Sequence, residues 1–348
     1  MTPRLSICIP TYNFGEFIGE TLKSVIDQAL PGLEIIVVDG ASTDNTEEVV
    51  DSWKKKFPAL KYFRLPKRGG IDHDLAKSVE LASGDYCWLF SSDDVMRPQA
   101  IQRLIERLND ACDVYVCEHS NCDRSMQKLH DHKIFSNDFV RTVEFGDMKE
   151  RRACLAAARN TEALFSFMSG LIVRRVKWLS VEPRAEFLGS CWWHVARLLE
   201  LARNQLKVCY VPEVWLDKRG DNDSFLERGV VNRLRIAVDG FIRISIHFYG
   251  AASVETDSVR RLLRNELPLL SFFYARDRVI QSPNLESKSE LDRIFSLCYK
   301  NCGLRGLVAR MLYYWLPVGI YRSLKSLYKL MRSGVRWARA RAKGMSHV

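Results

Sequence analysis

The first ninety residues alternate between short apolar runs and segments with helical spacing, and this alternation is the feature that most limits the possible folds. The apolar runs expected to form strands cover residues 5–10, 34–38, 60–65 and 86–90. The segments expected to form helices, in which apolar residues recur three or four positions apart, cover residues 17–30, 46–56 and 72–82. Strands that alternate with helices predict an α/β fold in which helices flank a mostly parallel sheet.

Polar segments follow three of these expected strands. Residues 10–13, 39–44 and 91–94 each come directly after an apolar run. Because ligands of open α/β sheets bind beyond the carboxyl ends of the strands, we expect these three segments to gather around one site.

Two adjacent carboxylates, Asp93 and Asp94, lie in the last of these segments. Hard cations such as Mg²⁺ and Mn²⁺ take oxygen ligands and share them between one or two carboxylates and substrate phosphates. Taken alone, the pair could equally cap a helix that starts near Pro98. The position at a strand end beside other polar segments favours a cation with an anionic ligand, most simply a diphosphate.

Three motifs together resemble those of the family 2 glycosyltransferases, which have the GT-A fold. They are Ile-Pro-Thr-Tyr-Asn at 9–13, Val-Val-Asp-Gly-Ala-Ser-Thr-Asp-Asn-Thr at 37–46 and Ser-Ser-Asp-Asp at 91–94. The resemblance covers about residues 4–225. Within the family, residues 70–72, 79–86 and 219–224 are most similar to abequosyltransferase-like enzymes of bacterial O-antigen assembly.

The resemblance implies a nucleotide-sugar site and a divalent cation, Mn²⁺ or Mg²⁺. Asp93 and Asp94 match the metal motif, but Ser91 replaces the first carboxylate of the usual Asp-x-Asp. The residues expected at the nucleotide sugar are Pro10, Thr11, Tyr12, Asn13, Asp39, Asp72, Ser92, Asp93 and Arg219. Asp39 would bind the base or ribose, because a carboxylate can accept two hydrogen bonds from either.

Simpler interpretations accompany several of these positions. Asp44 is expected to be a helix cap, and Asp72 could also cap the helix that follows it. Arg219 suits a diphosphate because a guanidinium forms paired hydrogen bonds to phosphate, but a solvated charged turn would also explain it.

The catalytic base is harder to assign. Family 2 enzymes usually carry a Glu-Asp pair at the start of a helix, and here Ser190 and Cys191 occupy those positions. We name His194 and Glu186 as candidate bases and Asp94 as a third catalytic residue. His194 could equally be a packed residue beside two tryptophans. Without the acid pair the stereochemistry of transfer stays open, and the leaving diphosphate could itself take the proton.

The net charge of +10 is concentrated at the C-terminus. Residues 303–348 contain ten Lys or Arg and no acidic residue, with aromatic and aliphatic residues between them. This pattern predicts an amphipathic helix on a membrane surface. Nucleic-acid binding and packing on the core are alternatives, and we expect no nucleic acid. The longest uncharged apolar stretch, residues 311–321, is too short to span a bilayer.

The remaining sequence predicts three regions and a cytosolic setting. They are a catalytic domain at 1–225, a helical region at 226–302 and the basic tail at 303–348. Helices are expected at 230–249, 258–280, with a kink at Pro268, and 287–300. The ten cysteines lack a Cys-x-x-Cys motif, which favours reduced thiols. No signal peptide is visible, and the cysteines and histidines at 117–132 fit no common zinc pattern.

Together these features predict a glycosyltransferase on the cytoplasmic, inner face of the bacterial plasma membrane. The donor would be a nucleotide diphosphate sugar, with CDP-sugars among the candidates, and the sugar a dideoxyhexose such as abequose. The acceptor would be a polyprenyl-diphosphate-linked glycan. The alternative is a non-catalytic GT-A protein that binds nucleotide or membrane, which the missing acids would explain. A polymerising synthase with its own channel is disfavoured, because no spanning segment is present.

Overall fold

The computed structural model describes residues 4–138, 140–182, 184–283 and 287–323. Tertiary contacts divide the chain into two compact units. The first runs to Ser224 and includes Asp239–Asn265, and the second comprises Phe225–Val238 and the residues from Glu266 onward. Every residue expected at the active site lies in the first unit.

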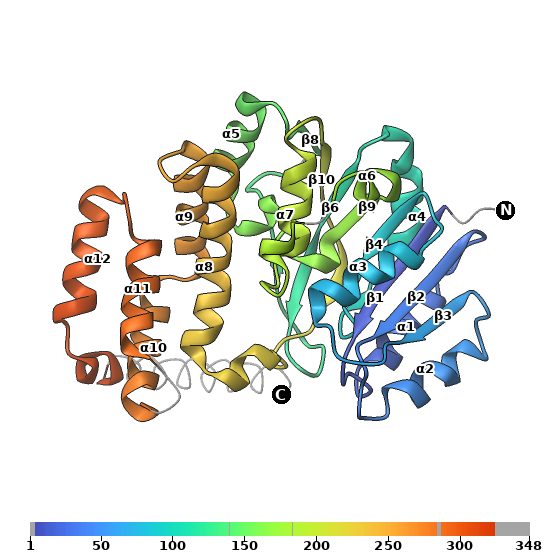
Figure 1. Cartoon of the computed structure of the whole chain (residues 1–348), viewed down its shortest axis with the longest axis horizontal. Helices are drawn as coiled ribbons and strands as arrows, with labels where there is room; N and C mark the ends of the chain where they lie inside the picture. The colour runs from blue at the N-terminus through green and yellow to red at the C-terminus, as the bar shows by residue number, and fades with distance from the viewer. Residues whose placement is uncertain (1–3, 139, 183, 284–286, 324–348) are drawn as a thin grey trace, which may run out of the picture. The chain divides into compact units, whose positions relative to one another are not determined.

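A mixed sheet of ten strands, counted over the described residues, organises the first unit (Figure 1). Its parallel part has the order β3-β2-β1-β4, formed by β1 (Leu5–Thr11), β2 (Leu33–Asp39), β3 (Leu60–Arg64) and β4 (Tyr86–Leu89). These are the four strands that the sequence predicts. The sheet continues through β9 (Leu171–Arg174), β6 (Val114–Cys122), β10 (Lys207–Lys218) and β5 (Val95–Met96). Antiparallel β9 separates two parallel regions, because β6 and β10 are again parallel. At the side of the sheet, β7 (Lys128–His132) pairs with β6, and β8 (Arg141–Glu144) pairs with β10.

Helices flank this sheet, which confirms the predicted α/β class. The predicted helices correspond to α1 (Ile18–Ile26), α2 (Thr46–Lys54) and α3 (Ile71–Leu81). Helix α3 packs on β1 and β2, whereas α1 packs against α2 and β5. The other helices of this part of the chain are α4 (Ala100–Arg107), α5 (Met148–Ala157), α6 (Arg175–Leu179) and α7 (Trp193–Leu201). Short 3-10 helices occur at η1 (Leu108–Asp110), η2 (Thr161–Leu164), η3 (Met168–Gly170), η4 (Ala185–Phe187) and η5 (Ser224–Arg228).

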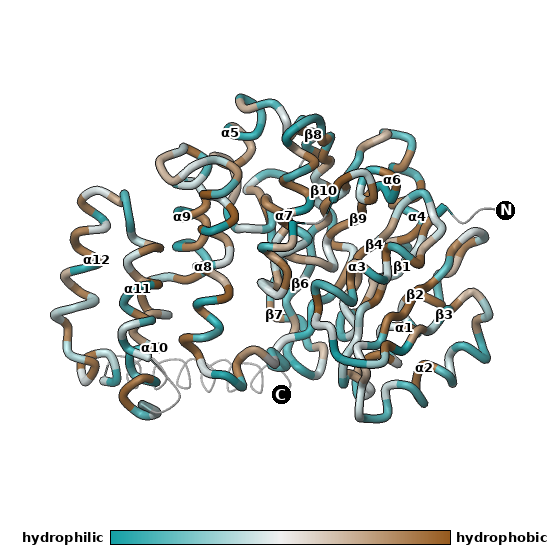
Figure 2. The backbone as a smooth tube through the Cα atoms, in the orientation of Figure 1, coloured by the Kyte–Doolittle hydropathy of each residue, from teal (hydrophilic) through white to brown (hydrophobic). Residues whose placement is uncertain are grey.

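The core of the first unit follows from the apolar runs. All seven residues of β1 and all seven of β2 are buried. Much of the sheet formed by these strands is brown in Figure 2, the colour of hydrophobic residues. The rings of Trp88 and Trp215 meet with centroids 5.8 Å apart, so the two parallel regions share one core. All ten cysteines are free thiols, and eight of them are buried. Strand ends that leave such a core are held rigidly, which suits residues that must position a ligand.

The helical region differs from its prediction at Pro268. Helix α8 (Val230–Tyr249) matches the predicted range, but the single helix expected at 258–280 is two helices, α9 (Val254–Glu266) and α10 (Leu269–Gln281). Pro268 is the N-cap of α10. A proline has no N–H to donate and disfavours helical backbone at the preceding residue, so it ends one helix and begins the next instead of producing a kink.

Helices α11 (Lys288–Cys298) and α12 (Gly303–Trp315) complete the second unit, and a further helical segment begins at Val318. The stacked rings of Phe295 and Tyr313, with centroids 3.9 Å apart, join α11 to α12. Within the described ranges, no helix has both the length and the apolar character needed to cross a bilayer. Residues 324–348 of the predicted basic tail lie outside the described residues.

Candidate active site

The carboxylate pair lies directly beyond β4. Asp94 is 2% exposed, and each of its oxygens accepts one hydrogen bond. Ser169 Oγ donates to Oδ2 at 2.5 Å, and the backbone N–H of Arg219 donates to Oδ1 at 3.1 Å. Burial raises the pKa of Asp94 to about 8, and the charge of Asp93 is the second cause of this rise. The charge of Asp93 thus disfavours ionisation of Asp94, an effect that a bound cation would offset.

Asp93 is oriented by polar side chains instead of by backbone groups. Asn222 Nδ2 donates to Oδ2 at 2.6 Å, and the hydroxyl of Ser91 donates to Oδ1. Ser91, which stands in place of the first acid of the usual motif, thus fixes the second one. The capping alternative is wrong, because strand β5 follows the pair and α4 begins after Gln99 without a side-chain cap.

The pair fits a hard divalent cation. Asp93 and Asp94 offer only oxygen ligands, and an oxygen that accepts one hydrogen bond retains a second lone pair. Among the residues that the structure describes, no group of three or more His, Cys, Asp and Glu side chains could hold a metal ion. Two carboxylates are nevertheless what Mg²⁺ sites commonly use, since water and substrate phosphates supply the other ligands.

Arg219 is a buried connector between three parts of this site. Its guanidinium donates to the carbonyl of Asp93 (3.0 Å), to the carbonyl of Arg124 (2.6 Å) and to Glu20 Oε2 (2.5 Å). The residue is 5% exposed. All three branches of the guanidinium therefore bind protein acceptors, and its role toward a diphosphate stays a prediction. The neighbouring Lys218, which the sequence reasoning missed, is exposed.

The ends of β1 and β2 form the expected nucleotide end of the site. Pro10 and Thr11 are buried, and Thr11 Oγ1 has no hydrogen-bond partner in the described part of the chain. The ring of Tyr12 lies 3.9 Å from the guanidinium carbon of Arg68. Asn13 adopts φ 55° and accepts the N–H of Thr43 at 2.7 Å, which ties the two strand ends together. A buried hydroxyl without a partner is a position where a ligand could supply the missing hydrogen bond.

Asp39 is fully buried, and both of its oxygens accept hydrogen bonds. The N–H and hydroxyl of Ser42 donate to Oδ1 at 2.8 and 2.7 Å, and Tyr62 OH donates to Oδ2 at 2.6 Å. Asp74, also buried, packs so closely that a Cβ on Gly40 would lie 2.4 Å from its Oδ2. Burial raises the pKa of Asp74. No local sequence pattern identifies Tyr62 or Asp74 as neighbours of this site, because their position depends on β3 and α3 folding beside β2.

Asp44 is not the helix cap that the sequence predicts, because the N-cap of α2 is the next residue, Asn45. The carboxylate of Asp44 has a structural role all the same. Its Oδ1 accepts the N–H of Thr46 at 3.0 Å at the start of α2, and its Oδ2 accepts the N–H of Gly15 at 2.9 Å. The carboxylate therefore fixes the loop after β1 to the N-terminus of α2.

Asp72 connects the start of α3 to the loop before α7. Its Oδ2 accepts the backbone N–H of Gly189 at 2.9 Å and of Cys191 at 3.0 Å. Burial raises its pKa to about 6, although backbone N–H groups of the loop act in the opposite direction. Helix α3 has Gly70 as its N-cap and no side-chain cap, so Asp72 does not cap it. Contact between Asp72 and the donor stays a prediction.

The two candidate bases occupy different environments. His194 is 5% exposed, its Nε2–H lies 3.1 Å from the carbonyl oxygen of Phe165, and burial lowers its pKa to about 4. Glu186 is exposed, and its Oε1 lies 3.1 Å from Nδ1 of His247. Within the described residues, neither makes a hydrogen bond or ion pair with Asp94. Their catalytic roles stay predictions.

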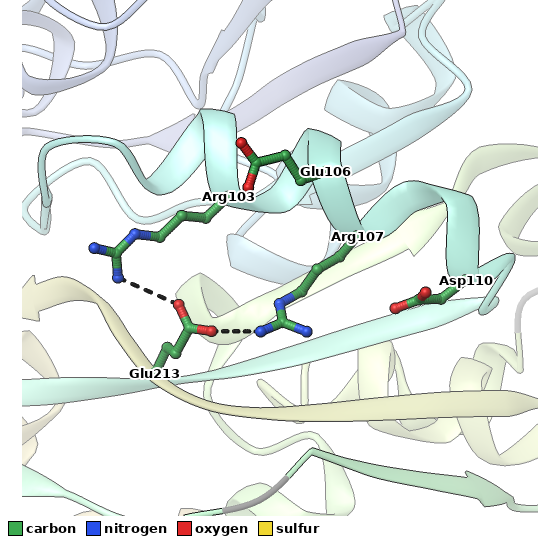
Figure 3. A pocket seen from close by; sticks show the side chains of 5 residues that line it. All are labelled: Arg103, Glu106, Arg107, Asp110 and Glu213. Atoms are coloured by element: carbon green, nitrogen blue, oxygen red, sulfur yellow. Dashed lines mark hydrogen bonds and ion pairs between the residues drawn. The ribbon is translucent and has the colours of Figure 1, made fainter.

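A surface pocket elsewhere in the first unit carries none of the expected site residues. Figure 3 shows its five charged side chains, which come from α4, η1 and the middle of β10. Arg103 and Arg107 both pair with Glu213, at 3.2 and 2.5 Å. Because Glu213 already binds two cations, this pocket has the features of a surface ion-pair network and not of a ligand site.

Comparison with known proteins agrees with this geometry. Residues 6–165, which contain the ends of β1, β2 and β4, match the model of glycosyl transferase family 2. The chain thus contains a family 2 glycosyltransferase domain. The chain is 29% identical over 305 residues to the abequosyltransferase RfbV of Salmonella typhimurium, a match that spans 85% of this chain and 90% of that one. It is also 30% identical over 121 residues to a GalNAc(5)-diNAcBac-PP-undecaprenol beta-1,3-glucosyltransferase of Campylobacter jejuni, across 34% of this chain and 38% of that one.

Solved structures confirm the GT-A fold of this chain. Residues 1–349 of TarS of S. aureus, in complex with UDP-GlcNAc, align with a TM-score of 0.57 and 15% identity over 95% of this chain and 92% of that chain. The mannosyltransferase PcManGT of Pyrobaculum calidifontis, in complex with GDP-Man and Mn²⁺, aligns with a TM-score of 0.53 and 17% identity over 90% of this chain and 88% of that chain. At these identities the likeness concerns the fold alone.

Proposed function

We propose that this protein transfers a dideoxyhexose such as abequose from a nucleotide diphosphate sugar to a polyprenyl-diphosphate-linked glycan during assembly of a bacterial surface polysaccharide. A CDP-sugar is the donor to test first. The similarity to an abequosyltransferase along most of both chains supports the sugar and the pathway class. The partial similarity to a glucosyltransferase whose name includes an undecaprenol-linked glycan supports the acceptor class.

The observation that carries the proposal is the pair Asp93 and Asp94 at the end of β4. Ser91, Asn222, Ser169 and the backbone of Arg219 orient the two carboxylates. Carboxylates held in this way would bind Mg²⁺ or Mn²⁺, which neutralises charge on a departing diphosphate. A fold neighbour was solved with GDP-Man and Mn²⁺, and we propose a cation of the same kind here.

Other residues of the first unit would hold the donor. Thr11, Tyr12 and Asp39 lie at the ends of β1 and β2, where the base and ribose would bind. Asp39 is fixed by Ser42 and Tyr62, so it presents the one remaining lone pair of Oδ2 in a constant direction. His194, Glu186 and Asp94 remain the candidate catalytic residues.

The exposed surface of helix α12 supports a location at a membrane. Its exposed apolar residues recur at helical spacing and form one stripe: Leu304, Leu307, Val308, Met311, Leu312 and Trp315. Trp315 is 83% exposed, and the neighbouring cations Arg305 and Arg310 are exposed as well. An apolar stripe with arginines beside it suits the boundary between acyl chains and anionic headgroups. We propose that this helix holds the protein on the inner face of the plasma membrane.

Sugar incorporation is the direct test. The purified protein is incubated with a panel of radiolabelled nucleotide sugars, bacterial lipid extract and Mn²⁺, and labelled lipid is extracted and counted. We expect incorporation that EDTA abolishes. Replacing both acids, Asp93→Asn with Asp94→Asn, should reduce it by at least about 100-fold, because the charge that holds the cation is removed. Glu48→Gln, which neutralises an exposed acid on α2, serves as the control.

A second candidate function is binding of nucleotide or membrane without sugar transfer. It is favoured by Ser91, Ser190 and Cys191, which occupy positions where the family usually has acids. Nucleotide binding by the wild-type protein, together with no incorporation from any donor in the panel, would favour that candidate. Full incorporation by the double variant would contradict the proposed metal site.

A further inference from the structure

Two adjacent cations at the end of β10 have opposite surroundings. Arg219 is buried, and its guanidinium binds two carbonyl oxygens and Glu20. Lys218 is exposed, and its ammonium makes no salt bridge with any residue that the structure describes. The chain therefore uses one of the two charges to build the site and leaves the other available.

The neighbouring arginines are also paired. Arg97 contacts Asp217 at 2.7 Å, and Arg124 contacts Glu16 at 2.7 Å. With Arg219 paired to Glu20, each of these arginines has a carboxylate partner of its own. Lys218 differs from all three, although it lies in the same part of the fold.

An aromatic ring fixes the position of Lys218. Its Nζ lies 5.2 Å from the ring centroid of Phe167, within the range of a cation–π interaction. The ring of Phe167 in turn packs on His119, with centroids 4.2 Å apart. The ammonium is thus partly preorganised and does not sample all the space around an exposed lysine, which lowers the entropy cost of binding an anion.

The segments that carry Lys218 and Phe167 both hold Asp94. Two residues after Phe167, the hydroxyl of Ser169 donates to Oδ2 of Asp94. One residue after Lys218, the backbone N–H of Arg219 donates to Oδ1 of the same carboxylate. Lys218 therefore lies next to both groups that hold Asp94, where the diphosphate of a donor would contact the cation.

We propose that Lys218 binds the diphosphate of the nucleotide sugar and stabilises it as it leaves, a role that rests on the proposed glycosyl transfer. In the transfer step the acceptor hydroxyl oxygen forms a bond to the anomeric carbon of the donor sugar. The bond between that carbon and the diphosphate oxygen breaks, and its electron pair stays on the diphosphate. The ammonium of Lys218 offsets this added negative charge, and the hydroxyl proton passes to a base or to the diphosphate itself.

The imidazoles beside Phe167 do not compete for this anion. Burial, and next the charge of Lys218, lowers the pKa of His119 to about 2 and of His132 to about 4. Both side chains are therefore neutral near pH 7, and they provide no charge for a diphosphate.

Calorimetric titration of the full-length protein tests the role of Lys218. CDP, UDP and GDP are titrated in the presence of Mn²⁺, and the corresponding nucleosides are titrated in parallel. Lys218→Gln should bind the preferred diphosphate about 10- to 100-fold more weakly, as expected for the loss of one charged hydrogen bond. Its affinity for the nucleoside should not change, and Lys218→Arg should restore most of the diphosphate affinity. Lys207→Gln, which removes an exposed cation at the opposite end of β10, is the matched control.

Turnover separates a role in the transition state from a role in binding alone. With saturating donor, Lys218→Gln should also reduce kcat for sugar incorporation by at least about tenfold. Equal diphosphate affinity in Lys218→Gln and wild type would overturn the inference while leaving the proposed function intact. Failure of the wild-type protein to bind any nucleoside diphosphate would contradict the proposed function, and this inference with it. A Lys218→Gln variant that loses nucleoside and diphosphate affinity equally would also overturn the inference, because the effect would then not be specific to phosphate.

Discussion

Oδ2 of Asp72 accepts the backbone N–H of Gly189 at 2.9 Å, across 117 positions of the sequence. The same oxygen accepts the N–H of Cys191, whose φ of 70° is unfavourable for a residue with a side chain. Asp72 thereby holds the loop in which related enzymes carry their acid pair. One buried carboxylate connects the donor side of the site to the expected acceptor side.

Removing this acceptor should destabilise the protein. We expect Asp72→Ala to lower the free energy of unfolding by about 2–3 kcal/mol, because two buried N–H groups lose their partner. Asp72→Asn should cost less than about 1 kcal/mol, since the amide oxygen still accepts both bonds and no charge is buried. Urea unfolding at pH 7.5 measures both variants. If Asp72→Asn and Asp72→Ala lower the free energy of unfolding equally, the charge of the carboxylate, and not its hydrogen-bond geometry, holds the loop.

Arg219 should contribute to stability as well as to the site. Arg219→Met leaves the carbonyls of Asp93 and Arg124 without a donor, and we expect a loss of about 2–4 kcal/mol. Its pair with Glu20, which is half-exposed, should add little. Glu20→Gln isolates that pair and should change the free energy of unfolding by less than about 1 kcal/mol. Chemical unfolding measures the free energy of unfolding of both variants. An Arg219→Met protein as stable as wild type would refute the structural role of Arg219.

His194 should make folding sensitive to acid. Burial lowers the pKa of His194 from 6.5 to about 4, so the unfolded chain binds a proton at a higher pH than the folded protein. The contribution of this residue is complete above pH 6.5 and is lost as the pH falls to about 4, by about 3 kcal/mol in total. His194→Gln can still donate to the carbonyl of Phe165 and should flatten this part of the pH profile. The exposed His130→Gln is the control, and a wild-type slope in His194→Gln would contradict the prediction.

The apolar stripe of α12 should control membrane binding. Replacing Leu307, Met311 and Trp315 together with serine should weaken partition into vesicles that contain anionic phosphatidylglycerol by at least about tenfold, because three large apolar side chains no longer enter the interface. The unfolding midpoint should change little, since all three are exposed. Leu129→Ser removes an exposed leucine from β7 and provides the control. Vesicle flotation reports partition, and undiminished flotation of the triple variant would exclude α12 as the binding surface.

The sequence by itself determined the first four strands, the three helices between them and the position of the carboxylate pair. These features depend on local patterns: the strands β1 and β2 are mostly apolar and are buried along their whole length, the helices have a period near 3.6, and polar residues follow where each strand ends. The carboxylate pair and the strand-end loops could be found in the same way, because each lies within a few residues of the strand that positions it.

Only the tertiary structure decided how the charged residues of the site are used. Arg219 and Lys218 are adjacent and chemically similar, so no local pattern distinguishes them. Arg219 is buried and binds the loop after β4 through the carbonyl of Asp93, whereas Lys218 is exposed. Likewise, the hydrogen bonds of Asp72 to the loop before α7 and of Tyr62 to Asp39 join residues that are far apart in sequence. Such contacts depend on how strands and helices are arranged in space, because burial and hydrogen bonding depend on every neighbouring element and not on the residue's own segment.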